Sequence, residues 1–313
     1  MPTATPLPTP TPVRYRSTLS GLALESPPPR PIAVQIDNHP QARPQAGVVE
    51  ADLVYETPTE AQLTRLTALF QSKSPDVVGP VRSARLVDLA ILPMHDAVLA
   101  YSGAAQGVTQ ALLAAGAELL HAEGNATAAG WRDWSRVMPH NLYVSIPALR
   151  EVAAGLGWDR PTSALPLAFG PPPPGGEPAE VVTIPYAQGW VEFRFDRHTN
   201  RYRRWIDGAL QVDARTGDPV APANVVVLVT EFWYREVGAG SASEWALDVD
   251  LATSGDAWLF RDGRVYQVRW ERPAEREPLR FIDRESGQHV SLVAGQTWIC
   301  IVSPDLAAQV VID

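Results

Sequence analysis

An apolar run that ends in two polar residues, Ile32-Ala33-Val34-Gln35-Ile36-Asp37-Asn38, is the part of the chain that best predicts its fold. The run predicts a buried strand that ends where the polar residues begin. Strands are predicted over residues 32–37, 52–57, 64–71 and 97–102, and helices over 84–93, 106–116 and 145–155. Strands interleaved with helices indicate a layered α/β domain in this half of the chain.

The second half of the chain has a different pattern. Residues 191–195 alternate apolar and polar side chains, and Val225–Val229 is apolar throughout. Asp262-Gly263 lies between two strand-like runs and is a typical hairpin turn. These features predict a mainly antiparallel β domain, so the expected fold class is α+β.

Proline clusters divide the chain. Pro171–Pro174 followed by Gly175-Gly176 suits neither a helix nor a central strand, so we expect a domain boundary there. The predicted organisation is a Pro/Thr-rich tether over 1–30, an α/β domain over 31–165, a Pro/Gly linker over 166–180 and an antiparallel β domain over 181–313.

Composition excludes several classes of protein. The 313 residues carry a formal net charge of −9, which argues against general binding to nucleic acid or to an anionic membrane surface. There is no run of about 18 apolar residues, so no spanning helix is expected. Cys300, the single cysteine, lies in an apolar run and is expected to be a buried strand residue. No zinc-ligand spacing occurs, and no cofactor is expected.

The amino-terminal residues indicate a location. Residues 1–12 alternate proline with small residues and favour an extended spacer. Such a stalk resembles the tether that follows the lipidated cysteine of a bacterial lipoprotein. Because neither a signal peptide nor that cysteine is present in the sequence, we expect that the anchor was removed. An ordinary disordered tail on a cytosolic protein is the alternative.

Polar residues gather near the predicted strand ends of the first half. Asp37 and Asn38 directly follow a strand, where ligand crevices of α/β sheets form, although Asn-His-Pro is also turn chemistry. Glu56 and Glu60 could share a proton or hold a metal. We favour instead their pairing with arginines of the same region, which are Arg43, Arg65, Arg82 and Arg85.

Two further motifs contain polar residues that could bind a ligand or take part in catalysis. The segment Gly79–Arg85 is predicted to start a helix, and its Ser83 and two arginines would then suit an anion, with ordinary N-capping as the alternative. It lacks the spacing of a nucleotide-binding P-loop. His140-Asn141 could serve acid–base or orienting roles, but a structural histidine is favoured. There is no Gly-x-Ser-x-Gly motif.

Several of these motifs together resemble one known family. The similarity rests on residues 33–47, 51–56, 64–71 and 79–85, with Gly295–Ile299 near the end, and it covers about residues 30–305. The chain thus resembles the YerB-like lipoproteins. The resemblance implies a bacterial, extracytoplasmic, lipid-anchored protein with two domains of unknown function. The sequence departs from the family where Ala61-Gln62 replaces a glycine pair, so that loop is expected to differ.

These observations predict one ligand-binding cleft. Its expected residues are Asp37, Asn38, Arg43, Glu56, Glu60, Arg65, Arg82, Ser83, Arg85, His140 and Asn141. The arginines would bind the negative groups of a small polar or anionic molecule or of a cell-wall fragment. One alternative is a hydrolase with Asp37 or Glu56 as base and His140 as acid. The other is a scaffold for a protein partner, in which the polar residues clamp the two domains together.

Overall fold

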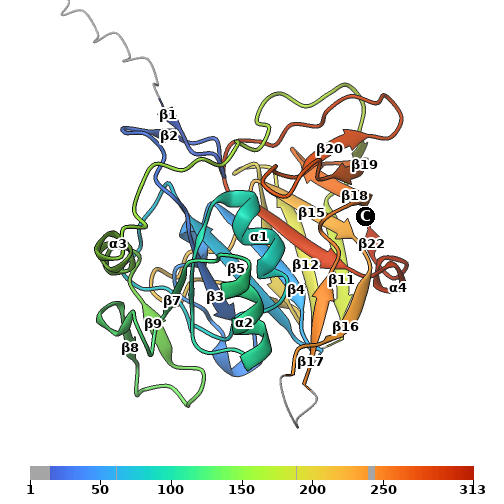
Figure 1. The fold of residues 1–313 in the computed structure, drawn as a ribbon. Coiled ribbons are helices and arrows are strands. Elements are labelled where there is room, and N and C mark those ends of the chain that lie inside the picture. Colours follow the sequence, from blue (N-terminus) through green and yellow to red (C-terminus); the bar gives the residue numbers. More distant parts are fainter. Residues whose placement is uncertain (1–14, 61, 188, 239–243) are drawn as a thin grey trace, which may run out of the picture.

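The computed structural model describes residues 15–60, 62–187, 189–238 and 244–313, and strands predominate in it. A sheet of eleven strands runs through the whole molecule (Figure 1). Its order is β10 (Glu177–Pro178), β19 (Arg264–Glu271), β18 (Ser254–Arg261), β15 (Asn224–Val229), β21 (Thr297–Val302), β4 (Leu53–Pro58), β5 (Thr64–Phe70), β3 (Ile32–Asp37), β6 (Val98–Tyr101) and β7 (Leu119–His121), and β20 (Arg280–Asp283) pairs with β19.

A second sheet covers part of one face of this large sheet. It consists of β14 (Ala209–Leu210), β13 (Arg201–Ile206), β12 (Gly189–Asp196), β11 (Val181–Tyr186) and β22 (Val311–Ile312). Three strand pairs complete the described sheets: β1 (Tyr15–Arg16) with β2 (Ala23–Leu24), β8 (Gly130–Arg132) with β9 (Leu142–Val144), and β16 (Phe232–Glu236) with β17 (Trp245–Val249).

Helices lie on both faces of the large sheet. They are α1 (Asp88–His95), α2 (Gln106–Ala114), α3 (Ile146–Gly155) and α4 (Pro304–Ala307), with 3-10 turns η1 (Pro40–Ala42), η2 (Val48–Glu50) and η3 (Thr127–Ala129). One apolar core packs α1 and α2 against one face, and the other packs α3 and the second sheet against the opposite face. We call these the helix face and the second-sheet face. No helix among the described residues is long and apolar enough to cross a membrane.

Most predicted elements form where the pattern placed them. The strand over 32–37 is confirmed as β3, and the helices over 106–116 and 145–155 are confirmed as α2 and α3. The Ser145 side chain accepts a hydrogen bond from the Ala148 amide and so caps α3. Asp262 and Gly263 both have positive φ, as the turn between β18 and β19 requires.

The predicted helix start at Gly79–Arg85 is wrong. The Val81 amide donates to the Leu142 carbonyl at 2.7 Å, and the Arg82 amide donates to the Gln35 carbonyl at 2.9 Å. The backbone is therefore extended beside β3, and α1 begins only at Asp88. Because residues 79–85 are not helical, no helix N-terminus is available there to bind an anion.

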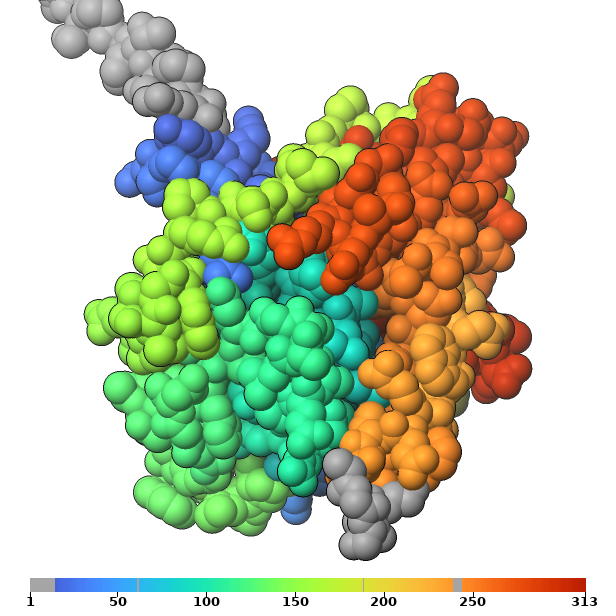
Figure 2. Space-filling view, in the orientation of Figure 1, coloured from blue at the N-terminus to red at the C-terminus, as the bar shows by residue number. Residues whose placement is uncertain are grey.

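Only part of the second half of the chain forms a separate antiparallel sheet. Strand β21 pairs in parallel with β15 on one side and with β4 of the first half on the other. One sheet thus joins both halves, which lie side by side in Figure 2, the first half in blue to green and the second in orange to red. The mainly antiparallel pattern holds for β11–β14 and β22 and for β18–β20.

Residues assigned to the tether and the linker partly pack against the protein. Leu19 and Ser20 are buried, and the Ser17 hydroxyl donates to the Gln71 side chain at 2.7 Å, so the tether prediction over 1–30 fails for residues 15–30. Residues 1–14, which include the Pro/Thr repeat, lie outside the described residues. In the predicted linker, Leu167 and Ala179 are buried.

Candidate functional site

The pleat of the large sheet divides the predicted cluster in two. Asp37 at the end of β3 is opposite Arg65 of β5, whereas Glu56 of β4 is opposite Leu66. Since side chains alternate between the faces of a strand, Asp37 and Arg65 lie on the helix face and Glu56 lies on the second-sheet face. The expectation of one shared cleft is therefore wrong.

We call the group on the second-sheet face the closed cluster. It consists of Glu56, Arg204, Thr64, Asn38 and Trp298. Arg204 Nη2 donates to both oxygens of Glu56 at 2.8 Å, and both side chains are fully buried. Trp298 Nε1 donates to Oε2 at 2.9 Å, and Thr64 Oγ1 donates to Oε1 at 2.8 Å. Asn38 Nδ2 donates to Oε1 at 3.2 Å. Glu56 therefore has protein donors at both of its oxygens.

Further amides extend the closed cluster. Asn38 Oδ1 accepts a hydrogen bond from Gln45 Nε2 at 2.9 Å, and Gln45 Oε1 accepts one from Gln211 Nε2 at 2.8 Å. Arg204 also donates to the Gln211 side chain, and its guanidinium lies 4.7 Å from the centre of the Trp298 ring. Beside Asn38, Arg43 and Thr64 there is only a crevice of about 10 Å³. Within the described part of the chain, this crevice has no room for a ligand larger than a water.

Two neighbours of the closed cluster have shifted pKa values. Burial lowers the pKa of Arg43, and the nearby Arg204 charge lowers it further. The Arg43 guanidinium donates to the Asn38 carbonyl at 2.9 Å and lies 3.7 Å from an Asp207 oxygen. Burial and the Glu56 charge raise the pKa of Cys300 well above its usual value. Cys300 is a buried residue of β21, as predicted.

We call the group on the helix face the open cluster. It consists of Asp37, Arg65, Arg82, Arg85, Glu60 and His140. His140 Nδ1 lies 2.7 Å from Asp37 Oδ2, Arg82 Nε lies 3.1 Å from the same oxygen, and Arg65 Nη1 lies 3.4 Å from Oδ1. Burial alone would raise the pKa of Asp37, but Arg65, the His39 amide, His140 and Arg82 together hold it below its usual value.

The arginines of the open cluster make ion pairs that are not aligned hydrogen bonds. Arg65 Nε and Nη1, Arg82 Nε and Arg85 Nε are buried atoms without a hydrogen-bond partner among the described residues. Burial and the neighbouring Arg85 lower the pKa of Arg65 to about 9, although Asp37 opposes that shift. The side chains of Arg82 and Arg85 are 30% and 22% exposed, so solvent reaches this cluster.

Glu60 and Ser83 have smaller roles than the sequence predicted. Glu60 Oε2 lies 3.3 Å from Arg85 Nε, while Oε1 accepts the Leu247 amide of β17 at 3.1 Å. Glu60 is thus an ion-pair partner of an arginine, as we favoured. The Ser83 hydroxyl donates to the Ser102 carbonyl at 3.3 Å.

His140 and Asn141 face different neighbours. The His140 ring stacks on His39, with their centres 4.5 Å apart, and it contacts Asp37. Asn141 is fully buried, and its Oδ1 accepts a hydrogen bond from Arg132 Nη1 at 2.7 Å. His140 therefore belongs to the open cluster and Asn141 does not.

The hydrolase alternative needs Asp37 and Glu56 within reach of one another across one cleft, and the structure contradicts this. Asp37 and Glu56 lie on opposite faces of the sheet, so they cannot act on one bond. Ser83 donates to a backbone carbonyl and not to His140. Among the described residues, no group of three or more His, Cys, Asp or Glu side chains is arranged to hold a metal ion.

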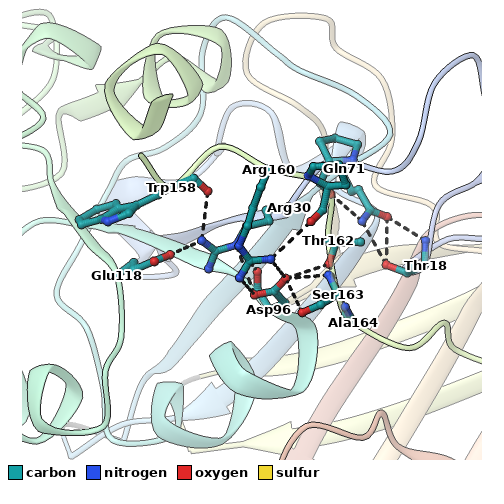
Figure 3. Close-up of polar contacts among 12 residues, drawn as sticks. Thr18, Arg30, Gln71, Asp96, Glu118, Trp158, Arg160, Thr162, Ser163 and Ala164 are labelled. Carbon is teal, nitrogen blue, oxygen red and sulfur yellow. Dashed lines mark hydrogen bonds and ion pairs between the residues drawn. The ribbon is translucent and has the colours of Figure 1, made fainter. Parts of the chain in front are cut away.

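A third polar group, away from both clusters, has a structural role (Figure 3). Asp96 accepts hydrogen bonds from Arg160 at 2.7 and 2.8 Å and from the Ser163 amide at 2.8 Å, and Arg30 lies beside it. Asp96 also ends α1 with a positive φ. These contacts fasten the segment after α3 to the helix face.

The sequence analysis missed Arg204, Gln45, Gln211 and His39. A signal for Arg204 was present, because Arg204 shares one face of β13 with Tyr202 and Ile206, and all three are buried. An arginine on the apolar face of a strand predicts a buried ionic partner. Gln45, Gln211 and His39 had no comparable pattern.

The chain matches models of two protein domains. Residues 19–159 match the "Protein of unknown function (DUF3048) N-terminal domain", and residues 182–299 match the corresponding C-terminal domain. A Bacillus subtilis (strain 168) protein named "Putative lipoprotein YerB" is 32% identical over 286 residues, which are 89% of this chain and 82% of that protein. The crystal structure of YerB protein from Bacillus subtilis superposes with a TM-score of 0.81 at 31% identity, covering 95% of this chain and 99% of the other.

Proposed function

This chain belongs to the DUF3048 family, of which YerB is a member, and we propose that it is a lipid-anchored extracytoplasmic protein that binds an anion at the open cluster. The name of the Bacillus relative supports the lipid anchor. The Pro/Thr repeat over residues 1–12 supports a tether between that anchor and the folded part.

The buried guanidinium of Arg65 carries the proposal. A buried donor without an acceptor costs about 1–3 kcal/mol, and more when the group is charged. Arg65 Nε has no hydrogen-bond partner among the described residues. Arg65 Nη1, Arg82 Nε and Arg85 Nε lie 3.1 to 3.4 Å from carboxylate oxygens but make no aligned hydrogen bond with them. An anion that accepts these hydrogen bonds would remove the cost and offset the mutual repulsion of the three arginines.

The charges of the open cluster indicate the class of ligand. Three guanidinium groups face the two carboxylates of Asp37 and Glu60, which leaves the cluster positive. Guanidinium forks bind carboxylate and phosphate oxygens in pairs. The ligand we propose is a small molecule, or an exposed group of a cell-wall fragment, that bears a phosphate or carboxylate.

The closed cluster supports a second proposal, that of a scaffold. Glu56 of the first half and Arg204 of the second half form a buried ion pair that fixes the two halves together. A protein partner would then bind a rigid surface formed by both halves. In this proposal the open cluster would be occupied by water alone.

Titration with inorganic phosphate and with acetate tests the anion site. We expect saturable heat in calorimetry and a rise in Tm, since a ligand at 100 times its Kd stabilises the folded state by about 2.7 kcal/mol. Arg82→Gln with Arg85→Gln should abolish both effects while the protein stays folded, because both side chains are partly exposed.

Arg197→Gln is the matched control, because Arg197 is an exposed, ion-paired arginine of the second half. It should leave phosphate binding unchanged. If wild type and the Arg82/Arg85 variant respond equally to both anions, the proposal fails and the scaffold remains.

A further inference from the structure

A hollow lined by aromatic residues lies on the other side of the loop that follows β3. Its volume is about 660 Å³, and its lining includes Trp131, Trp134, Tyr143, Arg132, Asp133 and Arg136. We call it the tryptophan hollow. Ala214 and Arg215 of the second half form part of its wall, so both halves of the chain build it.

The tryptophans of this hollow are unusually exposed. Trp134 is 75% and Trp131 is 41% exposed, and Trp131 stacks on Tyr143 with ring centres 6.3 Å apart. Large aromatic side chains are normally buried, because exposing them forgoes hydrophobic stabilisation. Two of them at one concave surface indicate a binding site.

The loop that carries Trp134 is held in place before any ligand arrives. Arg136 donates to the Tyr143 hydroxyl at 2.6 Å and to the carbonyls of Ala42, Arg43 and Pro44 at 3.1 to 3.2 Å. The Asp133 amide donates to the Asn141 carbonyl at 2.8 Å. Because these contacts fix the loop, binding would cost little conformational entropy.

Polar groups lie between the aromatic rings. Asp133 accepts hydrogen bonds from the Ser135 amide and hydroxyl, which lower the pKa of Asp133 and keep it charged. Arg132 and Arg215 add guanidinium donors at the lining. The hollow thus offers flat apolar surfaces together with charged hydrogen-bonding groups.

We propose that the tryptophan hollow binds a carbohydrate chain. A pyranose ring has an apolar C–H face that packs on an indole and a rim of hydroxyls that bond to carboxylate and guanidinium groups. A proline-rich peptide would need apolar slots between the aromatic rings, where this site has charged residues. Ligand pockets in proteins typically measure about 300–1,000 Å³, and the volume of the hollow lies within that range.

This proposal does not rest on the anion site. The two sites have no residue in common: His140 contacts Asp37 in the open cluster, while Arg136, four residues earlier in the chain, lines the hollow. Binding of a sugar in the hollow needs no anion.

The test is titration of the whole protein with three tetrasaccharides: one of N-acetylglucosamine, one of β-1,4-linked glucose and one of α-1,4-linked glucose. Tryptophan fluorescence and calorimetry measure the binding. We expect saturable binding of at least one of the three. Trp134→Ala should weaken it at least tenfold, because it removes the most exposed stacking surface. The three sugars distinguish an amino-sugar chain from a plain glucan.

Trp190→Ala is the matched control, since Trp190 is 63% exposed on β12 and does not line the hollow. It should leave the affinity unchanged. Three results would overturn the proposal: no binding of any tetrasaccharide, equal affinity in the Trp134→Ala variant, or Trp134-dependent binding of a Pro/Thr peptide in place of sugar. Loss of phosphate binding in the Arg82→Gln with Arg85→Gln variant would not change the sugar affinity expected here.

Discussion

The closed and open clusters both combine arginine with carboxylate side chains, and both lie near the same ends of the central strands β3, β4 and β5. They differ in how their polar atoms are hydrogen-bonded. Glu56 has donors at both carboxylate oxygens, and its partner Arg204 lies against the Trp298 ring. Arg65 Nη1 makes only an unaligned ion pair with Asp37 at 3.4 Å, and Arg65 Nε, like Arg204 Nε, has no hydrogen-bond partner among the described residues. The second sheet covers the first group, whereas Arg82 and Arg85 of the second group are 30% and 22% exposed.

This difference shows that charge density alone does not identify a site. A buried charge whose hydrogen bonds are made by the protein holds the fold together. A charge whose ion pairs are not aligned hydrogen bonds, and which solvent reaches, can accept a ligand from outside. Variants of each cluster distinguish a charge that stabilises the fold from a charge that binds a ligand.

Arg204→Met should be the most damaging change. It leaves the Glu56 carboxylate buried without its charge partner, which costs about 3–5 kcal/mol of unfolding free energy. Urea denaturation measures the loss. Arg203→Met on the same strand removes an exposed pair with Asp196 and should cost under about 1 kcal/mol.

Glu56→Gln combined with Arg204→Met should recover more than half of that loss. The glutamine carbonyl still accepts hydrogen bonds from its neighbours, and no buried charge remains. Equal stability of the single variant and wild type would show that the closed cluster does not fasten the two halves.

Asp37→Asn should change stability and ligand affinity in opposite directions. The pKa of Asp37 is lowered in the folded protein, so its carboxylate stabilises the fold above about pH 4, its pKa range in the unfolded chain. That contribution is lost as the pH falls through the lower folded pKa. We expect the unfolding free energy of the Asp37→Asn variant to be about 1–3 kcal/mol below that of wild type at pH 7, and this difference to become smaller at acidic pH.

The same Asp37→Asn variant should bind phosphate more tightly, because the internal carboxylate no longer competes for Arg65 and Arg82. Denaturation from pH 3 to 7 and phosphate calorimetry measure the two effects. Weaker phosphate binding in the variant would mean that Asp37 itself is part of the ligand site.

Glu60→Gln should have the smallest effect. Glu60 is 30% exposed, so losing its ion pair with Arg85 should change stability by less than about 1 kcal/mol. The glutamine carbonyl can still accept the Leu247 amide. Phosphate affinity should rise about twofold, because one negative charge leaves the open cluster. A fall in affinity would place the ligand on the Glu60 side chain.

The sequence predicted most strands and helices because their hydrophobic periods are regular. It did not predict the parallel pairing of β21 with β4, since this contact joins Trp298 to Val54 across most of the chain and no local pattern records it. The extended path of residues 79–85 also depends on a distant strand, namely β9, through the Leu142 carbonyl.

The candidate site was predicted in part. The predicted ion pairing of Glu60 with an arginine of the same region is found in the structure, and so is the proximity of Asp37 to Arg65 and Arg82. The assignment of Glu56 to the same cleft failed, because it ignored strand register. Alternation along β3 and β4 sets the face of each residue only when the pairing partner is known.

NMR of the arginine Nε–H groups during phosphate titration tests the central claim most directly. The signals of Arg65, Arg82 and Arg85 should shift with one common affinity, while that of Arg204 stays in place. If all four signals remain still, the open cluster binds no phosphate. If the Arg204 signal moves with the others, the two clusters are not separate.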